Sequence, residues 1–253
     1  MCNVIVIPAY EPDERLIGLL ETLERSGLTR IVVTDDGSGP EYTSIFIRAS
    51  ELGCVVVRHE HNLGKGAAIR TGIDKALREF GPDIGIITAD ADGQHLPQDI
   101  IRISDAMASF PGRLILGVRD FSGENVPFRC AFGNRVTSVL FKFGTGITCS
   151  DTQTGLRGIP SGLVPLALST EGDRYDYEMN FLIEAVKSAP LIMIPIETVY
   201  ENGNEASHFR PVRDSLLIYR DPLIKLGSGV AAAGLGAFVV SLLRGRGSDR
   251  QDR

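Results

Sequence analysis

Short runs of β-branched residues alternate with longer amphipathic stretches through the first half of the chain. This alternation is typical of βαβ units, in which helices cover both faces of a parallel sheet. We therefore predict an α/β fold with a mostly parallel sheet flanked by helices. The predicted strands are residues 4–7, 30–34, 54–58, 84–88 and 114–117. Ligands of such sheets bind at the carboxyl ends of the strands, so the residues after each run are the first candidates for chemistry.

Apolar residues at helical spacing predict the helices between those strands. The apolar faces comprise Leu16, Leu19, Leu20 and Leu23, then Ile69, Ile73, Ala76 and Leu77, then Ile100, Ile101, Ile103 and Met107. Pro97 stands where the first turn of a helix tolerates proline. The second half is less regular, with a helix-like stretch at residues 135–143 and an apolar strand at residues 191–196.

The composition, 43% hydrophobic and 23% charged residues, is that of a globular protein and excludes a disordered chain. A formal net charge of −6 argues against a protein that coats nucleic acid, because such binding needs a basic face. Cys2, Cys54, Cys130 and Cys149 form no C-x-x-C pair, so we expect reduced thiols. No basic segment precedes the N-terminal apolar run, which favours a buried strand over a signal peptide. We therefore expect the body of the protein to stay in the cytoplasm.

Acidic loops follow three of the predicted strands. Residues 8–11 (Pro-Ala-Tyr-Glu) follow the first, residues 35–38 (Asp-Asp-Gly-Ser) the second, and residues 90–95 (Asp-Ala-Asp-Gly-Gln-His) the fourth. An aromatic ring beside carboxylates suits a nucleoside, since the ring packs on the base and the acids accept hydrogen bonds from base or ribose. For the first two loops the alternative is a rim tyrosine and an aspartate-capped turn.

Asp90 and Asp92 are the strongest of these signals. Two carboxylates two residues apart can turn toward one hard divalent cation, and Gln94 can add a neutral oxygen. Mg²⁺ or Mn²⁺ held by few protein ligands keeps positions open for substrate phosphates and neutralises charge on a diphosphate leaving group. The alternative is an acidic surface loop that binds nothing.

Arginines gather around the loop after the fifth strand and close a later acidic motif. Guanidinium groups match phosphate oxygens, so we predict an anionic ligand there, a diphosphate or an acceptor phosphate, with surface ion pairing as the alternative. The arginines are Arg119, Arg129, Arg135 and Arg157. Lys65 stands between two glycines without the following Ser or Thr of a Walker A loop, so phosphate binding and a structural role both stay open.

Five motifs follow one another along the chain, at residues 8–11, 35–38, 62–66 (Asn-Leu-Gly-Lys-Gly), 90–95 and 151–157 (Asp-Thr-Gln-Thr-Gly-Leu-Arg). In this order they resemble the family 2 glycosyltransferases of the GT-A fold, a Rossmann-like fold of nucleotide-diphospho-sugar transferases. Within that family they resemble the branch that includes dolichyl-phosphate mannose synthase and bacterial polyprenyl-phosphate glycosyltransferases. The likeness covers residues 3–221, most of the chain.

The resemblance implies a UDP- or GDP-linked sugar as donor and Mg²⁺ or Mn²⁺ held by Asp90, Asp92 and Gln94. The candidate nucleotide-binding residues are Pro8, Tyr10, Glu11, Asp35, Asp36, Lys65 and Asp90. His208 and Arg210 would lie over the sugar diphosphate, with a structural role as the alternative for the lone histidine. The first loop departs from the family's commoner Pro-Ala-Tyr-Asn-Glu, because Glu11-Pro12 stands in place of Asn-Glu.

Sugar transfer breaks the C1–O bond while negative charge grows on the diphosphate, which a metal and arginines stabilise. A polyprenyl phosphate acceptor is ionised near neutral pH and needs no strong general base. A saccharide hydroxyl, as in cell-envelope polysaccharide synthesis, needs one, and Asp151 or an acid of residues 176–178 is the candidate. Asp151 and Asp92 are therefore the predicted catalytic residues of an inverting transferase.

An uncharged apolar run at residues 226–243 favours the lipid acceptor, because its length approaches the thickness of a bilayer's hydrocarbon core. The residues before it mix apolar and basic side chains as an interfacial helix does. We predict a glycosyltransferase domain at residues 1–211, an interfacial or transmembrane segment at 212–243 and a basic tail at 244–253. A re-entrant helix and a buried soluble helix are the alternatives for the apolar run. The protein would lie at the cytoplasmic face of the membrane, peripheral or with a single C-terminal anchor; its oligomeric state stays open.

Two other functions compete with this one. A haloacid-dehalogenase-type phosphatase also carries Asp-x-Asp after an apolar strand, but it expects Thr or Ser at the position of Gln94 and leaves the acids Glu11 and Asp36 unexplained. A nucleotide-sugar-binding module without turnover is the non-enzymatic alternative. Intact Asp90 and Asp92 favour a catalyst.

Overall fold

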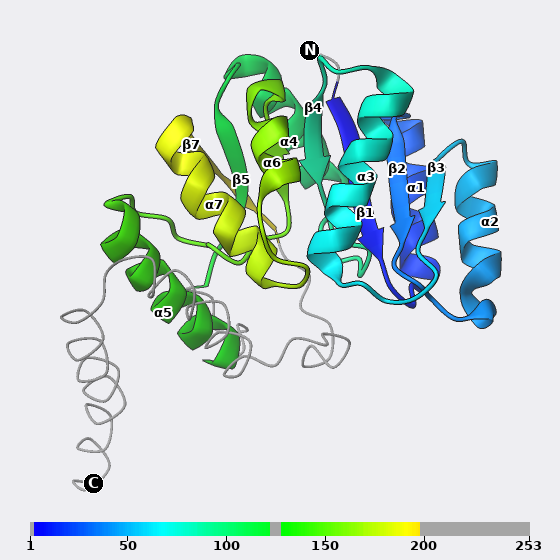
Figure 1. Ribbon diagram of the computed structural model, residues 1–253, viewed down its shortest axis with the longest axis horizontal. Coiled ribbons are helices and arrows are strands. Elements are labelled where there is room, and N and C mark those ends of the chain that lie inside the picture. Colours follow the sequence, from blue (N-terminus) through cyan, green and yellow to red (C-terminus); the bar gives the residue numbers. More distant parts are fainter. Residues whose placement is uncertain (1–2, 122–127, 198–253) are drawn as a thin grey trace, which may run out of the picture.

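The computed structural model describes residues 3–121 and 128–197, without the side chains of residues 128–132 and 136. Its strands form one seven-stranded sheet in the order β3-β2-β1-β4-β6-β5-β7 (Figure 1). The strands are β1 (Asn3–Ala9), β2 (Ile31–Asp35), β3 (Val55–Arg58), β4 (Gly85–Thr88), β5 (Leu114–Arg119), β6 (Arg157–Ile159) and β7 (Leu191–Ile196). The α-helices are α1 (Glu14–Arg25), α2 (Thr43–Glu51), α3 (Lys65–Phe80), α4 (Pro97–Ser109), α5 (Phe128–Thr145), α6 (Val164–Ser169) and α7 (Asp176–Ser188).

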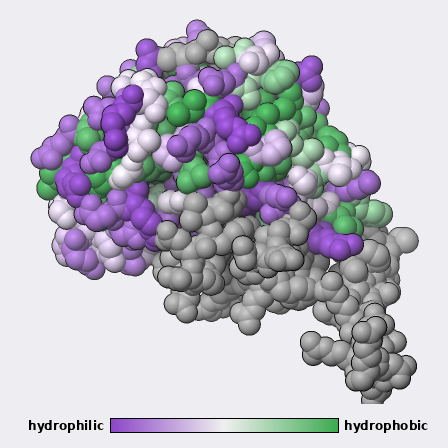
Figure 2. All heavy atoms as spheres, turned by 180° about the vertical axis from the view of Figure 1, so that it is seen from behind, coloured by the Kyte–Doolittle hydropathy of each residue, from purple (hydrophilic) through white to green (hydrophobic). Residues whose placement is uncertain are grey.

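Helices cover both faces of the sheet and divide the core in two (Figure 1). On one face α3, α6 and α7 pack against Val4, Val6 and Ile86. On the other face α1, α2 and α4 pack against Ile5 and Ile7. Successive residues of a strand point to opposite faces, so a strand covered on both must be apolar along its whole length. Seen from behind, hydrophilic and hydrophobic side chains are interspersed over the described surface (Figure 2).

The predicted α/β class, the six predicted strands and the apolar helix faces are confirmed. Leu16, Leu20 and Leu23 are fully buried in α1. Helix α4 begins at Pro97, as the proline predicts. Helix α5 is longer than the predicted stretch of residues 135–143.

Strand β6 is the exception to the parallel arrangement. It pairs antiparallel with both β4 and β5, whereas β5 and β7 are parallel to each other. An antiparallel strand begins at the edge where its parallel neighbours end. The segment that leads into β6 is therefore brought to the carboxyl ends of β4 and β5.

Within the described part of the chain, no helix is both long and apolar enough to cross a membrane. The predicted segments at residues 212–243 and 244–253 lie outside the described residues, as do His208 and Arg210. Cys54 and Cys149 are buried free thiols. Cys2 is not described, and neither is the side chain of Cys130.

Candidate active site

The sequence motifs meet at one edge of the sheet, made by the carboxyl ends of β1, β2, β4 and β5 and by the start of β6. Pro8 of β1 pairs with Thr34 of β2. Thr88 at the end of β4 pairs with Arg157 at the start of β6. The acid loops after β1, β2 and β4 and the later acidic motif are therefore neighbours in space, as expected for the ligand-binding edge of such a sheet.

The loop after β1 packs against the loop after β2. Glu11 has a left-handed backbone, with φ of 50°, and its N–H donates to Ser38 Oγ at 2.9 Å. A residue other than glycine rarely adopts this conformation, and where it does the site is often functional. A hydrogen bond with Glu11 raises the pKa of the Tyr10 phenol, and Tyr10 is 41% exposed. Asp35, the last residue of β2, is fully buried. Its carboxylate accepts from the Ser38 N–H at 2.8 Å and pairs with Arg58 Nε at 3.1 Å.

Asp36 organises the loop that leads into α3. Its carboxylate lies 2.8 Å from His59 Nδ1 and accepts hydrogen bonds from the N–H groups of Leu63 and Gly64, both at 2.9 Å. Lys65 is the first residue of α3, so Asp36 fixes the backbone from which the lysine side chain projects. The nucleotide contacts predicted for Asp35 and Asp36 stay predictions, because the described contacts of both carboxylates are internal.

Asp90 is the centre of the polar cluster after β4. Lys65 Nζ is 2.8 Å from its Oδ1, and His95 Nε2 is 3.2 Å from its Oδ2. Gly155 faces the same carboxylate so closely that a Cβ there would lie 2.5 Å from both oxygens, and the Gly155 carbonyl accepts from Thr88 Oγ1 at 2.7 Å. Burial alone raises the pKa of Asp90, but the nearby Lys65 ammonium and His95 lower it well below its ordinary value.

Asp92 has a different electrostatic environment. Its Oδ1 accepts from the Gln94 N–H at 3.0 Å. Partial burial and repulsion from the charge of Asp90 raise the pKa of Asp92 above its ordinary value. Among the described residues no three His, Cys, Asp or Glu side chains form a metal cage. Two carboxylates and a neutral amide fit Mg²⁺ or Mn²⁺, which bind through few protein groups and keep positions for phosphate oxygens.

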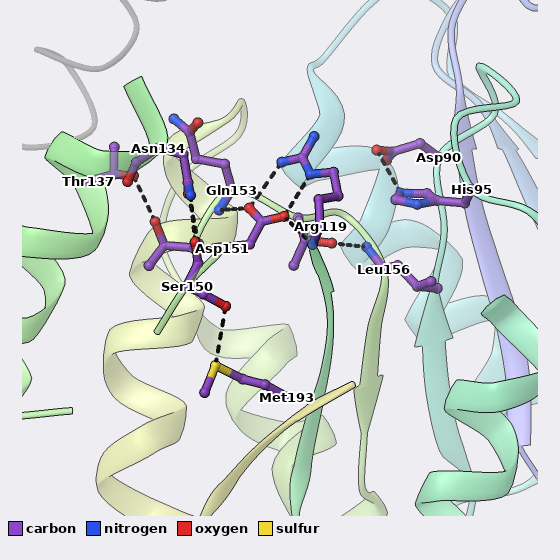
Figure 3. Close-up of polar contacts among 12 residues, drawn as sticks. Asp90, His95, Arg119, Asn134, Thr137, Ser150, Asp151, Gln153, Leu156 and Met193 are labelled. Carbon is purple, nitrogen blue, oxygen red and sulfur yellow. Dashed lines mark hydrogen bonds and ion pairs between the residues drawn. The ribbon is translucent and has the colours of Figure 1, made fainter. Parts of the chain in front are cut away.

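Arg119, the last residue of β5, forms a bidentate pair with Asp151, which lies in the loop between α5 and β6 (Figure 3). Asp151 Oδ2 accepts from Arg119 Nε at 2.6 Å and from the Arg119 N–H at 3.2 Å. Its Oδ1 accepts from Arg119 Nη2 at 3.0 Å and from the Gln153 N–H at 3.2 Å. A carboxylate offers about four acceptor positions, so all are filled. The catalytic role of Asp151 stays a prediction, and this geometry does not favour a proton-accepting role.

The structure places the other arginines predicted to bind an anion in different environments. Arg157 is 2% exposed, and its guanidinium donates to the carbonyls of Thr154 at 2.9 Å, Glu178 at 2.5 Å and Thr152 at 3.4 Å. These bonds tie the acidic motif to α7, and they do not favour the diphosphate contact predicted for Arg157. Arg135 is exposed on α5. The side chain of Arg129 is not described.

Glu178 is a site residue whose contact the sequence does not predict. It lies in the first turn of α7 with its side chain 9% exposed, and its Oε1 is 3.1 Å from Lys65 Nζ. Burial opposes the charge of the lysine, but Asp90 and Glu178 together raise the pKa of Lys65. The sequence indicates Glu178 only as one acid of residues 176–178, and no local pattern links it to Lys65.

The profile of Glycosyl transferase family 2 matches residues 4–148, more than half of the chain. The chain belongs to glycosyl transferase family 2. This family 2 glycosyltransferase is 34% identical over 202 residues to an uncharacterized protein of Methanocaldococcus jannaschii, a match that covers 78% of this chain and 81% of the relative. It is 29% identical over 244 residues to UDP-N-acetylglucosamine–dolichyl-phosphate N-acetylglucosaminyltransferase of Methanococcus voltae, covering 88% of this chain and 96% of the relative.

Solved structures agree with the GT-A fold of this family 2 glycosyltransferase. Mannosyl-3-phosphoglycerate synthase of Rubrobacter xylanophilus superposes with a TM-score of 0.68 at 16% identity, covering 89% of this chain and 73% of that one. Glucosyl-3-phosphoglycerate synthase of Mycobacterium tuberculosis, in complex with Mn²⁺, uridine diphosphate and its product, has a TM-score of 0.63 at 15% identity, covering 87% and 79%. At these identities the likeness concerns the fold alone, and together with the family it sets aside the phosphatase alternative.

Proposed function

We propose that this glycosyltransferase moves a sugar from a UDP- or GDP-sugar to a membrane polyprenyl phosphate. The observation that carries the proposal is the similarity to the Methanococcus voltae dolichyl-phosphate enzyme, which extends over 88% of this chain and 96% of that relative. A second relative supports it: polyprenol monophosphomannose synthase of Mycolicibacterium smegmatis, 29% identical over 61% of this chain and 60% of its own length.

The donor would occupy the carboxyl edge of the sheet, with its base beside Tyr10 and its diphosphate toward Lys65. Asp90, Asp92 and Gln94 would hold Mg²⁺ or Mn²⁺ there. Bound in this way, the cation would neutralise the charge that develops on the leaving diphosphate. The fit rests on two partly buried carboxylates of one loop: partial burial and the charge of Asp90 raise the pKa of Asp92, and a shared divalent cation would offset both.

The contacts of Asp151 and Glu178, two of the three candidate bases beside Asp176, support a phosphate acceptor over a saccharide hydroxyl. A hydroxyl acceptor must lose its proton to a base with a free acceptor position. Asp151 has its acceptor positions filled by Arg119 and Gln153, and Glu178 is paired with Lys65. A phosphate monoester is already ionised near neutral pH, so it attacks C1 without a base. Attack opposite the leaving diphosphate inverts the anomeric configuration.

A polyprenyl phosphate acceptor requires contact with a membrane. We therefore place the enzyme at the cytoplasmic face of the bilayer, as a peripheral protein or with a single C-terminal anchor. The apolar run of residues 226–243 supports this location by its composition and length.

The test uses the full chain, vesicles that contain dolichyl or undecaprenyl phosphate, and radiolabelled UDP- and GDP-sugars with Mn²⁺. We expect label in a lipid that mild acid releases, dependent on polyprenyl phosphate and on one nucleotide sugar. Asp92→Asn serves as the inactive comparison, and vesicles without polyprenyl phosphate control for donor hydrolysis. Transfer to an added water-soluble saccharide instead of the lipid would overturn the assignment.

A further inference from the structure

Lys65 lies between two carboxylates that come from distant parts of the chain. Its Nζ is 2.8 Å from Asp90 Oδ1 and 3.1 Å from Glu178 Oε1. The side chain of Lys65 is 21% exposed and that of Glu178 is 9% exposed, so solvent screens their charges only weakly. Within the described residues Glu178 makes no other ion pair. Its charge is therefore directed at the lysine.

The position of Glu178 is fixed by backbone packing. A Cβ on Gly66 would lie 2.5 Å from the Cβ of Tyr177, so the first turns of α3 and α7 are in direct contact. The Glu178 carbonyl accepts a hydrogen bond from the buried Arg157 guanidinium at 2.5 Å. These contacts fix the Glu178 backbone beside the start of α3, and from there its carboxylate reaches Lys65.

The charges of this cluster create a conflict when a divalent cation binds. Asp90 is a candidate metal ligand and also the partner of the Lys65 ammonium, so the two cations compete for one carboxylate and repel each other. A weakly screened ammonium left without a counter-ion is strongly unfavourable. Glu178 is the group that can serve as this counter-ion.

We propose that Glu178 is a positioning residue for metal binding, which neutralises Lys65 so that Asp90 can be shared with a divalent cation. The inference rests on the metal site of the proposed function. Because Glu178 acts through Lys65 and not on the metal, removing the lysine charge should make the glutamate dispensable. A residue with only a structural role would not show this dependence.

The test is Mn²⁺ binding to the full-length protein, measured by titration calorimetry and by the electron paramagnetic resonance of free Mn²⁺, with no sugar donor present. We expect Glu178→Gln to bind Mn²⁺ about tenfold more weakly, the loss of one charge in a weakly screened cluster. We expect Lys65→Met to bind a few-fold more tightly, because the competing cation is gone. The double variant should return to within about threefold of the wild type. Glu184→Gln, a change of the same kind at an exposed site of α7, is the matched control.

Wild-type affinity in Glu178→Gln, or a double variant as weak as that single one, would overturn the inference. If Glu178→Gln does not fold, the comparison of Lys65→Met with the wild type decides, because unchanged Mn²⁺ affinity in Lys65→Met means that no competition exists. Absence of Mn²⁺ binding by the wild type also overturns it. The lipid-transfer assay judges the proposed function independently of these results.

Discussion

Gly155→Ala should separate stability from function at this site. A Cβ at residue 155 would lie 2.5 Å from both carboxylate oxygens of Asp90, and ordinary contact begins near 3.4 Å. Thr88 Oγ1 donates to the Gly155 carbonyl at 2.7 Å and holds the backbone of residue 155, so we expect the Asp90 side chain to move instead. The Asp90 carboxylate then moves by about 1 Å, and its contacts with Lys65 and His95 are lost. Misplacement of this size can reduce turnover about 100-fold.

The same change should cost little stability. Gly155 has no positive φ, so alanine suits its backbone, and the displaced atoms are the end of one side chain. We expect a loss of about 1–2 kcal/mol of unfolding free energy, measured by urea denaturation. Gly18→Ala is the control: a Cβ there meets nothing within 4 Å, and it should stabilise α1 by about 0.5–1 kcal/mol with full activity. Wild-type turnover and Mn²⁺ affinity in Gly155→Ala would refute the reasoning.

Three further predictions concern Arg157, Cys54 and Asp92. Arg157→Met should lower the free energy of unfolding by about 3 kcal/mol, because three carbonyls lose their donor, and Arg157→Lys should be no more stable. A free energy of unfolding within about 0.5 kcal/mol of the wild type, measured by urea denaturation, would contradict this. Burial raises the pKa of the Cys54 thiol to about 11, above its value in the unfolded chain. Between pH of about 9 and 11 the thiol therefore ionises in the unfolded chain but not in the folded one, so the free energy of unfolding is unaffected at neutral pH and falls across that window. Stability should therefore fall by about 1–2 kcal/mol more over that window in the wild type than in Cys54→Ala, and equal slopes would argue against the buried thiol. Mn²⁺ affinity should rise with pH through the raised pKa of Asp92, since the proton and the metal compete, and Asp92→Asn should both weaken binding and flatten that pH dependence in calorimetric titrations.

Local patterns predict the parts of this molecule that depend on local chemistry. A strand such as β1 is covered on both faces, so its residues form an apolar run that is visible without any partner. In α1 the helical period places Leu16, Leu20 and Leu23 on one buried face. Because parallel strands end at one edge, the acid loops after β1, β2 and β4 could be assigned to one site from the sequence.

The contacts that complete the site depend on chain reversal and long-range pairing. Strand β6 has only three residues, Arg157–Ile159, too few for a period to appear, and its antiparallel direction carries Asp151 to the edge that Arg119 occupies. The Lys65–Glu178 pair joins the starts of α3 and α7, and nothing near either residue marks the other. A buried arginine also resembles a phosphate-binding arginine in sequence, which is why Arg157 was among the diphosphate candidates.

The two aspartates of the loop after β4 differ in charge compensation, and this difference assigns them different tasks. Asp90 already has Lys65 and His95 within 3.2 Å, so its negative charge is balanced before any ligand arrives. Asp92 has a backbone N–H of Gln94 but no ion pair among the described residues, and its pKa is raised. An arriving divalent cation gains most where a carboxylate is least compensated. Asp92 should therefore contribute more than Asp90 to metal affinity, and Asp90 more than Asp92 to holding the loop against Lys65 of α3.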